Sequence, residues 1–337
     1  MQNNEIEDVR IKYHDWLYPK SLPKTIRIDA STYCQLRCAG CAIQKNNVDG
    51  LGKGFLKFEN FKRFLDDNTQ IERVELSNSG EIFLNPDLIK IMEYSYQKDV
   101  ALEADMGTNF NTVSDEQLHA LVDYKFRFIS FSIDGASQET YSQYRCGGNF
   151  DNVIDNIKKL LEIKNKKGSH YPEMRWQFVP NEFNEGEIAQ VKALTKELGI
   201  PIWFKLNFIG GYKPSNLELL KAQTGLSEIT RAEYLEKYEL PYLNEDCLQV
   251  FLDPQFNWDG MFLGCCRCWK HGFKPNLFDD GLEACINSED VRRFKEFLLL
   301  HDPDPEYYKD LPCWNCALWK GRKKFGKVLE LPSPDSV

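Results

Sequence analysis

Three cysteines near the start of the chain, Cys34, Cys38 and Cys41, have types and a spacing that suit metal chemistry. They follow a short β-rich run, in the segment STYCQLRCAGC, and so are expected in a loop after a strand. Three thiolates at this spacing can bind three irons of one 4Fe–4S cluster, and the fourth iron is then open to a ligand from outside the protein. A zinc site would need a fourth ligand nearby, but the next histidine along the chain is His119.

A second group of seven cysteines runs from Cys247 to Cys316, and Cys146 stands alone between the groups. The N-terminus is polar and acidic, with neither a secretory signal nor an apolar window of membrane-spanning length. We therefore expect a soluble, cytoplasmic protein that does not bind a membrane. Because disulfides rarely persist in the cytoplasm, clustered thiols there more often bind metal or do redox chemistry.

The formal net charge of −9 weighs against a nucleic-acid groove, which would need clustered cations to neutralise phosphates. The one basic run, residues 320–327, is interpreted as a solvated tail. The length of 337 residues suits one large domain with a smaller one, or two ordinary domains.

Short β-rich runs alternate with amphipathic helical runs after residue 24, and this alternation predicts a parallel sheet with right-handed crossovers. The pattern alone leaves open whether the sheet is closed. After about residue 210 it gives way to segments rich in turns, aromatics, Pro and Cys. The expected strands are Thr25–Ala30, Arg73–Ser77, Val100–Met106, Phe128–Ile133, Arg175–Val179 and Ile202–Phe208. The expected helices are Phe58–Asp67, Pro86–Gln97, Ser114–Tyr124, Phe150–Lys164 and Glu185–Leu198.

The cysteine triad after the first strand resembles the signature of the radical S-adenosylmethionine (SAM) superfamily. The resemblance implies an α/β fold with a partial (β/α)6 barrel, an open iron that chelates the amino and carboxylate groups of SAM, and cleavage of SAM to a 5′-deoxyadenosyl radical. One position departs from the family pattern, because Gly40 stands before the third cysteine where the family usually has an aromatic residue.

Further positions resemble the family's SAM-binding motifs in their order along the chain. The segment Asn78, Ser79, Gly80 and Glu81 is similar to its GGE motif, which implies that Glu81 accepts the SAM ammonium. Ser132 and Asp134 are assigned to the ribose hydroxyls. Thr108, Asn109 and, more weakly, Gln177 are the other candidates for SAM contact.

The spacing of Cys247, Cys265, Cys313 and Cys316 resembles the SPASM and twitch domains of this superfamily. No cysteine follows Cys316, which favours the shorter twitch form with one auxiliary 4Fe–4S cluster. A structural zinc site made of the same four thiols is the alternative. The implied organisation is an N-terminal extension over 1–23, a barrel over 24–225 and an auxiliary-cluster domain over 226–337.

Several residues remain as candidates for catalysis. Glu103, Asp105 and Lys205 lie on expected barrel strands, where each is a candidate base or a surface residue. Cys146 is a buried or surface thiol, or a hydrogen-atom donor to a substrate radical. Cys266, Cys268 and Cys285 remain open as alternative ligands, buried small side chains or a hydrogen-atom donor.

The implied activity is radical oxidation of a small sugar- or cyclitol-like molecule, because the single-auxiliary spacing resembles a dehydrogenase that oxidises a cyclitol alcohol. The alternative is radical modification, by epimerisation or cross-linking, of a ribosomally made peptide. A non-catalytic iron–sulfur or zinc protein is a third hypothesis. The radical reading also implies a reducing partner such as flavodoxin or ferredoxin.

Overall fold

The computed structural model describes residues 2–41, 50–207, 212–268 and 272–332. Its centre is a single eight-stranded sheet, made of β1 (Thr25–Ile28), β2 (Arg73–Glu75), β3 (Ala101–Thr108), β4 (Phe128–Ser132), β5 (Glu173–Phe178), β6 (Ile202–Phe204), β7 (Gln255–Phe256) and β8 (Phe262–Gly264). The strand order is β6-β5-β4-β3-β2-β1-β7-β8. Neighbouring strands from β6 to β7 run parallel, and β8 is antiparallel to β7.

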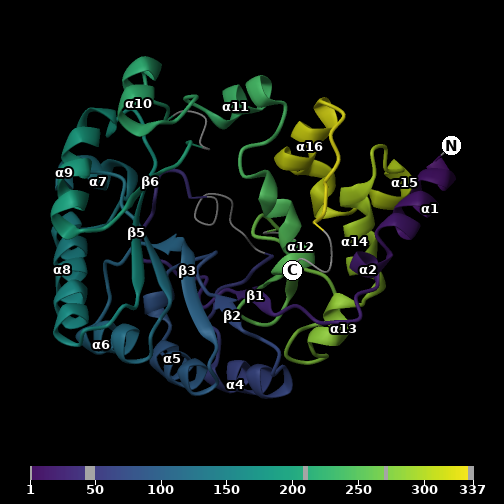
Figure 1. The fold of residues 1–337 in the computed structure, drawn as a ribbon, viewed down its shortest axis with the longest axis horizontal. Helices are drawn as coiled ribbons and strands as arrows, with labels where there is room; N and C mark the ends of the chain where they lie inside the picture. Colours follow the sequence, from purple (N-terminus) through teal and green to yellow (C-terminus); the bar gives the residue numbers. More distant parts are fainter. Residues whose placement is uncertain (1, 42–49, 208–211, 269–271, 333–337) are drawn as a thin grey trace.

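Helices connect the first six strands and lie along the outside of the sheet (Figure 1). They are α4 (Phe58–Asp67), α5 (Leu88–Gln97), α6 (Asp115–Asp123), α7 (Gln138–Tyr144), α8 (Phe150–Lys166) and α9 (Ile188–Leu198), with short 3₁₀ turns η1 (Ile82–Leu84) and η2 (Glu185–Glu187). Six parallel strands with outer helices confirm the predicted α/β fold with a partial barrel. None of the helices within the described ranges combines the length and apolarity needed to cross a bilayer.

The sequence forms these helices because apolar residues recur at helical spacing. In α4, Phe61, Phe64 and Leu65 are buried at positions i, i+3 and i+4. The start of α6 is fixed by a capping box between Ser114 and Gln117. In β3 the side chains alternate, so that Leu102 and Ala104 enter the hydrophobic core and the residues between them take the other face.

The C-terminal region continues the same sheet. Strand β7 pairs with β1 in parallel, with Arg27 opposite Gln255 and Ile28 opposite Phe256. Strand β1 is therefore paired on both edges, by β2 on one side and by β7 on the other. The helical elements of this region are α10 (Leu217–Thr224), α11 (Arg231–Tyr238), η3 (Asn244–Leu248), α12 (Gln249–Leu252), α13 (Leu282–Ile286), α14 (Glu289–Leu299), α15 (Pro305–Tyr308), η4 (Pro312–Asn315) and α16 (Ala317–Lys324).

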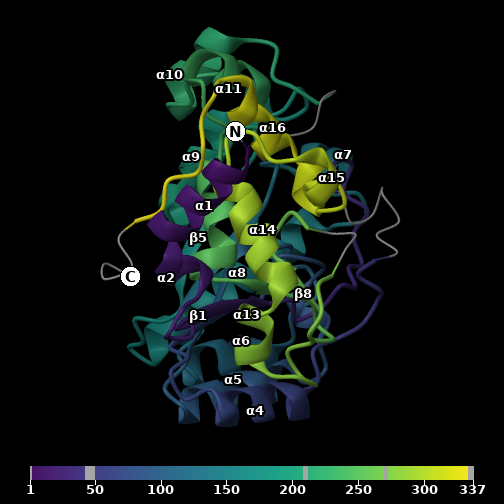
Figure 2. The ribbon, with the colours of Figure 1, turned by 90° about the vertical axis from the view of Figure 1, so that its right-hand side faces the viewer.

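The N-terminal extension, which shows no strong pattern in the sequence, forms α1 (Gln2–Lys12) and α2 (His14–Leu17). Figure 2 shows both helices beside α14 of the C-terminal region. Arg10 donates two hydrogen bonds to the carboxylate of Glu296, at 2.6 Å from Nε and 3.2 Å from Nη2. Lys295 donates to the Trp16 carbonyl at 3.1 Å. The N-terminal helices are thus held against α14 by charged side chains, and nothing in the sequence pattern indicates these contacts.

The Arg10–Glu296 contact predicts a measurable contribution to stability. Glu296 is 1% exposed, so replacing Arg10 by Ala leaves a buried carboxylate with little compensation. We expect the free energy of unfolding to fall by about 1–3 kcal/mol, the usual range for an orphaned buried acceptor. Thermal unfolding followed by circular dichroism measures it, with the exposed Glu7→Ala on the same helix as control. Equal midpoints for Arg10→Ala and Glu7→Ala would contradict the docking.

Candidate active site

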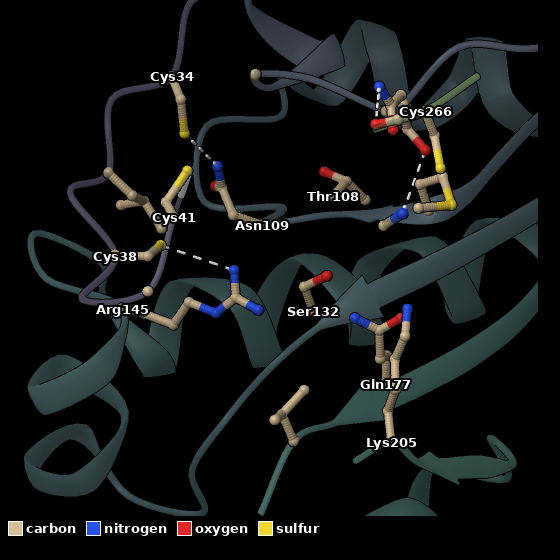
Figure 3. Close-up of a pocket in the computed structure, with 18 of the residues that line it drawn as sticks. Cys34, Cys38, Cys41, Thr108, Asn109, Ser132, Arg145, Gln177, Lys205 and Cys266 are labelled. Atoms are coloured by element: carbon tan, nitrogen blue, oxygen red, sulfur yellow. Dashed lines mark hydrogen bonds between the residues drawn. The ribbon is translucent and has the colours of Figure 1, made fainter. Parts of the chain in front are cut away.

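A cavity opens where the strands of the barrel end, which is where parallel β/α folds gather their chemistry (Figure 3). The loop after β1 contributes its three cysteines and Gly40, and the ends of β2 to β6 contribute polar side chains. The C-terminal region closes the remaining side. The lining residues are Cys34, Leu36, Cys38, Gly40, Cys41, Ser77, Asn78, Gly80, Met106–Asn109, Ser132, Tyr144, Arg145, Gln177, Val179, Lys205, Arg231, Leu243, Asp246, Cys266 and Arg267.

The cysteine loop is held in place by backbone hydrogen bonds to the segment that follows α7. The amide of Arg37 donates to the carbonyl of Cys146 at 2.9 Å, and the amide of Ala39 donates to the carbonyl of Tyr144 at 2.9 Å. These bonds tie a loop after β1 to a loop after β4. The three thiols consequently share one wall of the cavity (Figure 3).

Two polar groups point at the thiols of this wall. Asn109 donates from Nδ2 to the Cys34 Sγ at 3.5 Å, and Arg145 donates from Nη1 to the Cys38 Sγ at 3.7 Å. Burial raises the pKa of Cys34 to about 12 and also raises the pKa of Cys38. Both thiols are therefore protonated without metal, and coordination to iron would deprotonate them. Donors aimed at sulfur suit the negative charge that a bound cluster would bring.

Arg145 lines the cavity although the sequence gave no signal for it. Its Nε and Nη2 lie 2.7 and 2.6 Å from the Asp134 Oδ2, and the other carboxylate oxygen accepts from the Val179 amide at 2.8 Å. Asp134 is fully buried, and both of its oxygens are used inside the protein. The expected contact of Asp134 with ribose hydroxyls therefore has no support in its position, since Asp134 holds Arg145 instead. A single arginine in a short polar helix end has no periodicity that could reveal this role.

The loop after β2 crosses the cysteine loop at a distance that only glycine permits. Gly80 has a φ of +66°, and a Cβ there would lie 2.4 Å from the Ser31 carbonyl oxygen and 2.6 Å from that of Tyr33. The next amide, of Glu81, donates to the Tyr33 carbonyl at 2.7 Å. Asn78 and Gly80 reach the cavity wall.

Glu81 and Ser79 of the same segment do not line the cavity. The Glu81 carboxylate accepts the Thr108 hydroxyl at 2.5 Å, the Asn109 amide at 2.7 Å and the Phe83 amide at 3.3 Å. Burial raises its pKa. The Ser79 amide donates to Asp29 at 2.8 Å. The Glu81 carboxylate thus connects the loop after β2 to the end of β3, and its contact with the SAM ammonium stays a prediction.

Ser132, Thr108, Asn109 and Gln177 lie where the sequence places SAM contacts, since all four line the cavity. The Gln177 Oε1 is buried and has no hydrogen-bond partner among the described residues. A buried amide oxygen without a partner is costly, so this atom is suited to accept from a ligand. Gly107 leaves the space that the Ser132 hydroxyl occupies, because a Cβ at Gly107 would lie 2.2 Å from the Ser132 Oγ.

The four candidates for catalysis are dispersed. Lys205 lines the cavity. Asp105 binds Arg175 at 2.7 Å, and Glu103 lies 3.3 Å from both Arg73 and Arg127. The structure does not bring Asp105 or Glu103 to the cavity wall.

Cys146 also lies off the cavity, although its own backbone supports the cysteine loop. Its thiol donates to the Gln143 carbonyl at 3.6 Å and is partly exposed. The position favours a surface thiol over a hydrogen-atom donor.

A second set of thiols gathers in the C-terminal region. Burial raises the pKa of Cys313 well above its ordinary value, and neighbouring Cys265, Cys247, Cys316 and Cys268 add to the shift. The four predicted ligands are therefore neighbours, and Cys268 lies among them. Within the described ranges, no three His, Cys, Asp or Glu side chains lie close enough to share a single metal ion.

A buried arginine accompanies this set of thiols. Arg322 is 1% exposed and donates from Nη2 to the Cys247 Sγ at 3.3 Å and from Nη1 to the Asn244 Oδ1 at 3.1 Å. It forms no ion pair with a carboxylate among the described residues. A buried guanidinium needs negative charge nearby, and deprotonated thiols bound to a metal cluster would supply it.

The remaining cysteines separate by position. Cys266, one residue after Cys265, lines the cavity on the side away from Cys34, Cys38 and Cys41 (Figure 3). Cys285 is fully buried in α13, where its thiol donates to the Pro275 carbonyl at 3.3 Å. Sequence spacing could not distinguish these positions, because adjacent residues in a turn point in different directions.

Residues 28–171 match the profile of the radical SAM superfamily, and they contain the cysteine triad and the ends of β2 to β4. Residues 28–171 of this chain therefore form a radical SAM domain. The AdoMet-dependent heme synthase of Methanosarcina barkeri is 26% identical over 179 residues, which are 52% of this chain and 48% of that protein. The chain thus spans about half the length of the curated relatives that it matches.

Solved radical SAM proteins share the fold over most of the chain. Streptococcus suis SuiB bound to S-adenosylmethionine has a TM-score of 0.62 at 17% identity, over 93% of this chain and 75% of that one. The protein anSMEcpe with bound AdoMet has a TM-score of 0.53 at 16% identity, over 89% and 88% of the two chains. At these identities the likeness is one of fold, and it includes the C-terminal region.

The contrast between buried Glu81 and cavity-lining Asn78 predicts separate effects of their removal. Glu81→Ala leaves the Asn109 and Phe83 amides unsatisfied, so we expect a loss of about 1–3 kcal/mol of stability for each. Asn78→Ala removes a single hydrogen bond, to the Cys266 carbonyl at 3.3 Å, so it should cost only about 0.5–1.5 kcal/mol of stability and weaken SAM binding. Calorimetric SAM titration and thermal unfolding of both variants measure this. A stable Glu81→Ala protein with weakened SAM binding would restore the direct role of Glu81.

Proposed function

We propose that this protein is a radical SAM enzyme whose Cys34, Cys38 and Cys41 hold a 4Fe–4S cluster and whose cavity binds SAM beside a small substrate. The observation that carries the proposal is the shared wall of three thiols in a cavity lined by the ends of the barrel strands. When bound, the cluster and SAM supply the electron and the 5′-deoxyadenosyl radical that abstracts a substrate hydrogen.

Different residues around the cavity are suited to stabilise the cluster and to bind SAM. Asn109 and Arg145 stabilise the cysteine wall by hydrogen bonds to sulfur. The Gly80 backbone lies against the cysteine loop and is suited to bind the methionine part of SAM. Asn78 also lines the cavity, where it donates to the Cys266 carbonyl at 3.3 Å, and its amide oxygen is suited to accept from SAM. Ser132 and the unsatisfied Gln177 amide oxygen are suited to bind its hydroxyl or amino hydrogens.

We further propose an auxiliary 4Fe–4S cluster held by Cys247, Cys265, Cys313 and Cys316, with Cys268 as the alternative ligand. The support is the gathering of these thiols and the buried Arg322 that donates to one of them. The proposed domains are a barrel over 24–225 and an auxiliary-cluster domain over 226–337, preceded by the extension 1–23. When bound, this cluster would supply the one-electron acceptor that an oxidation needs.

For the reaction we propose oxidation at a C–H beside a hydroxyl of a small sugar- or cyclitol-like molecule. Abstraction of one hydrogen atom, followed by loss of one electron and one proton, converts such an alcohol to a ketone. A second redox centre next to the cavity favours this reaction, because Cys265 of the auxiliary set is adjacent in sequence to cavity-lining Cys266.

Peptide modification is the second candidate, and the fold likeness to SuiB favours it. SuiB has also been solved bound to the precursor peptide SuiA, with a TM-score of 0.60 to this chain. Under either candidate we propose a cytoplasmic enzyme reduced by a flavodoxin or ferredoxin, because oxygen-sensitive clusters need a low-potential donor. Turnover with candidate sugars or cyclitols, compared with a precursor peptide, separates the two.

The first test concerns SAM cleavage. Cys38→Ala should abolish formation of 5′-deoxyadenosine from SAM under dithionite, because one iron of the cluster loses its ligand. Cys285→Ala, in a core far from the cavity, is the matched control and should retain the activity. Undiminished 5′-deoxyadenosine from Cys38→Ala, measured by chromatography, would overturn the assignment.

The second test concerns the auxiliary cluster. Anaerobically reconstituted protein should contain about eight irons per chain, and the Cys34/Cys38/Cys41 triple Ala variant about four. The spectrum of that variant should not respond to SAM, because four thiolates leave no open iron. One zinc and no iron in the triple variant, by elemental analysis, would make the C-terminal site structural and remove the proposed electron acceptor.

A further inference from the structure

The end of the cavity away from the cysteine loop has a marked excess of positive charge. Lys205, Arg231 and Arg267 line it together with one carboxylate, that of Asp246. Three cations and one anion leave a net charge of +2 at this end. Figure 3 shows Lys205 beside Gln177, across the cavity from Cys34, Cys38 and Cys41.

These cations come from three separate segments that the fold brings together. Lys205 follows β6 directly. Arg231 begins α11, and a parallel bridge between Asn207 and Thr230 sets that helix start beside the continuation of β6. Arg267 lies in the turn after β8, on the far side of the sheet in sequence order. Convergence of like charges costs energy, so it requires a compensating interaction.

Lys205 shows most directly that the protein itself does not supply this compensation. The residue is 9% exposed, and its ammonium forms no hydrogen bond or ion pair with any residue of the described ranges. It lies 4.7 Å from the centre of the Trp203 ring. Burial and the nearby Arg231 lower the pKa of Lys205 to about 8. The ammonium is therefore mostly protonated at neutral pH, which suits anion binding better than proton abstraction.

Of the nearby carboxylates, one compensates Arg267 and the other is paired outside this group of cations. Asp246 accepts from the Arg267 Nε at 2.8 Å, and Asp105 binds Arg175. Arg231 donates from Nε to the Leu206 carbonyl at 3.2 Å, and burial with the charge of Arg267 lowers its pKa to about 10. The cations thus repel one another in a partly dehydrated space, and an anion between them would relieve that repulsion.

The geometry points to an anion subsite at Lys205, Arg231 and Arg267 that binds a carboxylate or phosphate group of the substrate. This inference rests on the proposed function and narrows its substrate class to small acids or phosphate esters. The anionic group anchors the substrate at one end of the cavity, and the carbon to be attacked extends toward the cysteine wall. SAM carries its own carboxylate, but a SAM molecule bound to the cluster places it at the opposite wall, where Arg145 lies.

Titration of the reconstituted full chain with inorganic phosphate, and separately with acetate, at constant ionic strength tests the subsite. We expect phosphate or acetate to raise the thermal midpoint of the wild-type protein with saturation. Lys205→Met should raise the half-saturating concentration by at least about ten-fold, as for loss of a charge-assisted hydrogen bond. Lys205→Arg keeps the charge and should stay within about three-fold of wild type. Exposed Lys192→Met is the control and should behave as wild type.

The two anions distinguish the substrate classes. A stronger dependence of the phosphate effect on Lys205 indicates a phosphate ester as substrate, and a stronger dependence of the acetate effect indicates a carboxylic acid. Equal half-saturation in Lys205→Met and wild type, or no saturable effect on wild type, would overturn the subsite. A phosphate-dependent rise in the SAM dissociation constant of the wild-type protein would also overturn it, because the cations would then hold SAM. The proposed function is tested separately by 5′-deoxyadenosine formation, so either idea can fail alone.

Discussion

The pairing of β1 on both edges is the constraint on which the rest of the structure depends. The cysteine triad follows this strand, β2 pairs with one edge and β7 with the other. The loop after β2 places Gly80 against the cysteine loop, and the segment after the β7–β8 hairpin brings Cys266 to the cavity, where its carbonyl accepts from Asn78 at 3.3 Å. Strand β8 runs antiparallel to β7, so Cys266 reaches the cavity through this hairpin and not at the end of a parallel strand.

Hydrogen bonds to buried carboxylates hold the loops around that cavity in place. Glu81 joins the loop after β2 to the end of β3 through two hydrogen bonds, from the Thr108 hydroxyl and the Asn109 amide. Asp134 joins the end of β4 to Arg145 and to Val179 after β5. A buried carboxylate is costly unless its oxygens are satisfied, and each of these is satisfied by groups from another strand end. The residues that face a ligand are consequently their neighbours, among them Arg145 and Asn109.

Charge is distributed unevenly across the cavity, with thiols at one end and cations at the other. The thiol end suits iron and the methionine part of SAM, whereas the cation end suits the substrate in our proposal. Cys266 lies at the cation end, one residue from the thiols proposed to hold a second cluster. This arrangement places the proposed substrate between two redox centres, which suits an oxidation that removes a hydrogen atom and then an electron.

The sequence by itself determined the parts that depend on local order. Alternation of β-rich and amphipathic segments predicted the parallel sheet, because periodicity reflects which face is buried. The spacing of Cys34, Cys38 and Cys41 predicted a metal-binding loop, because three ligands on one short loop need no distant partner. Thr108, Asn109, Ser132 and Gln177 were singled out by the resemblance to a known family, and they line one cavity because the ends of consecutive parallel strands meet.

Only the tertiary structure decided which side chains face the cavity and which form hydrogen bonds within the protein that hold the loops around it. Glu81 and Asp134 have the residue types of ligand contacts, but their oxygens are taken by strand ends 27 and 45 residues away. Arg145, Arg231 and Arg267 gave no local signal, and Lys205 was a candidate only through its place on a barrel strand, because the convergence of these cations arises from pairing between distant segments. The docking of α1 on α14 is of the same kind, since it includes an ion pair across 286 residues. Long-range pairing of single polar residues leaves no periodicity in the sequence, and so it becomes visible only in the folded chain.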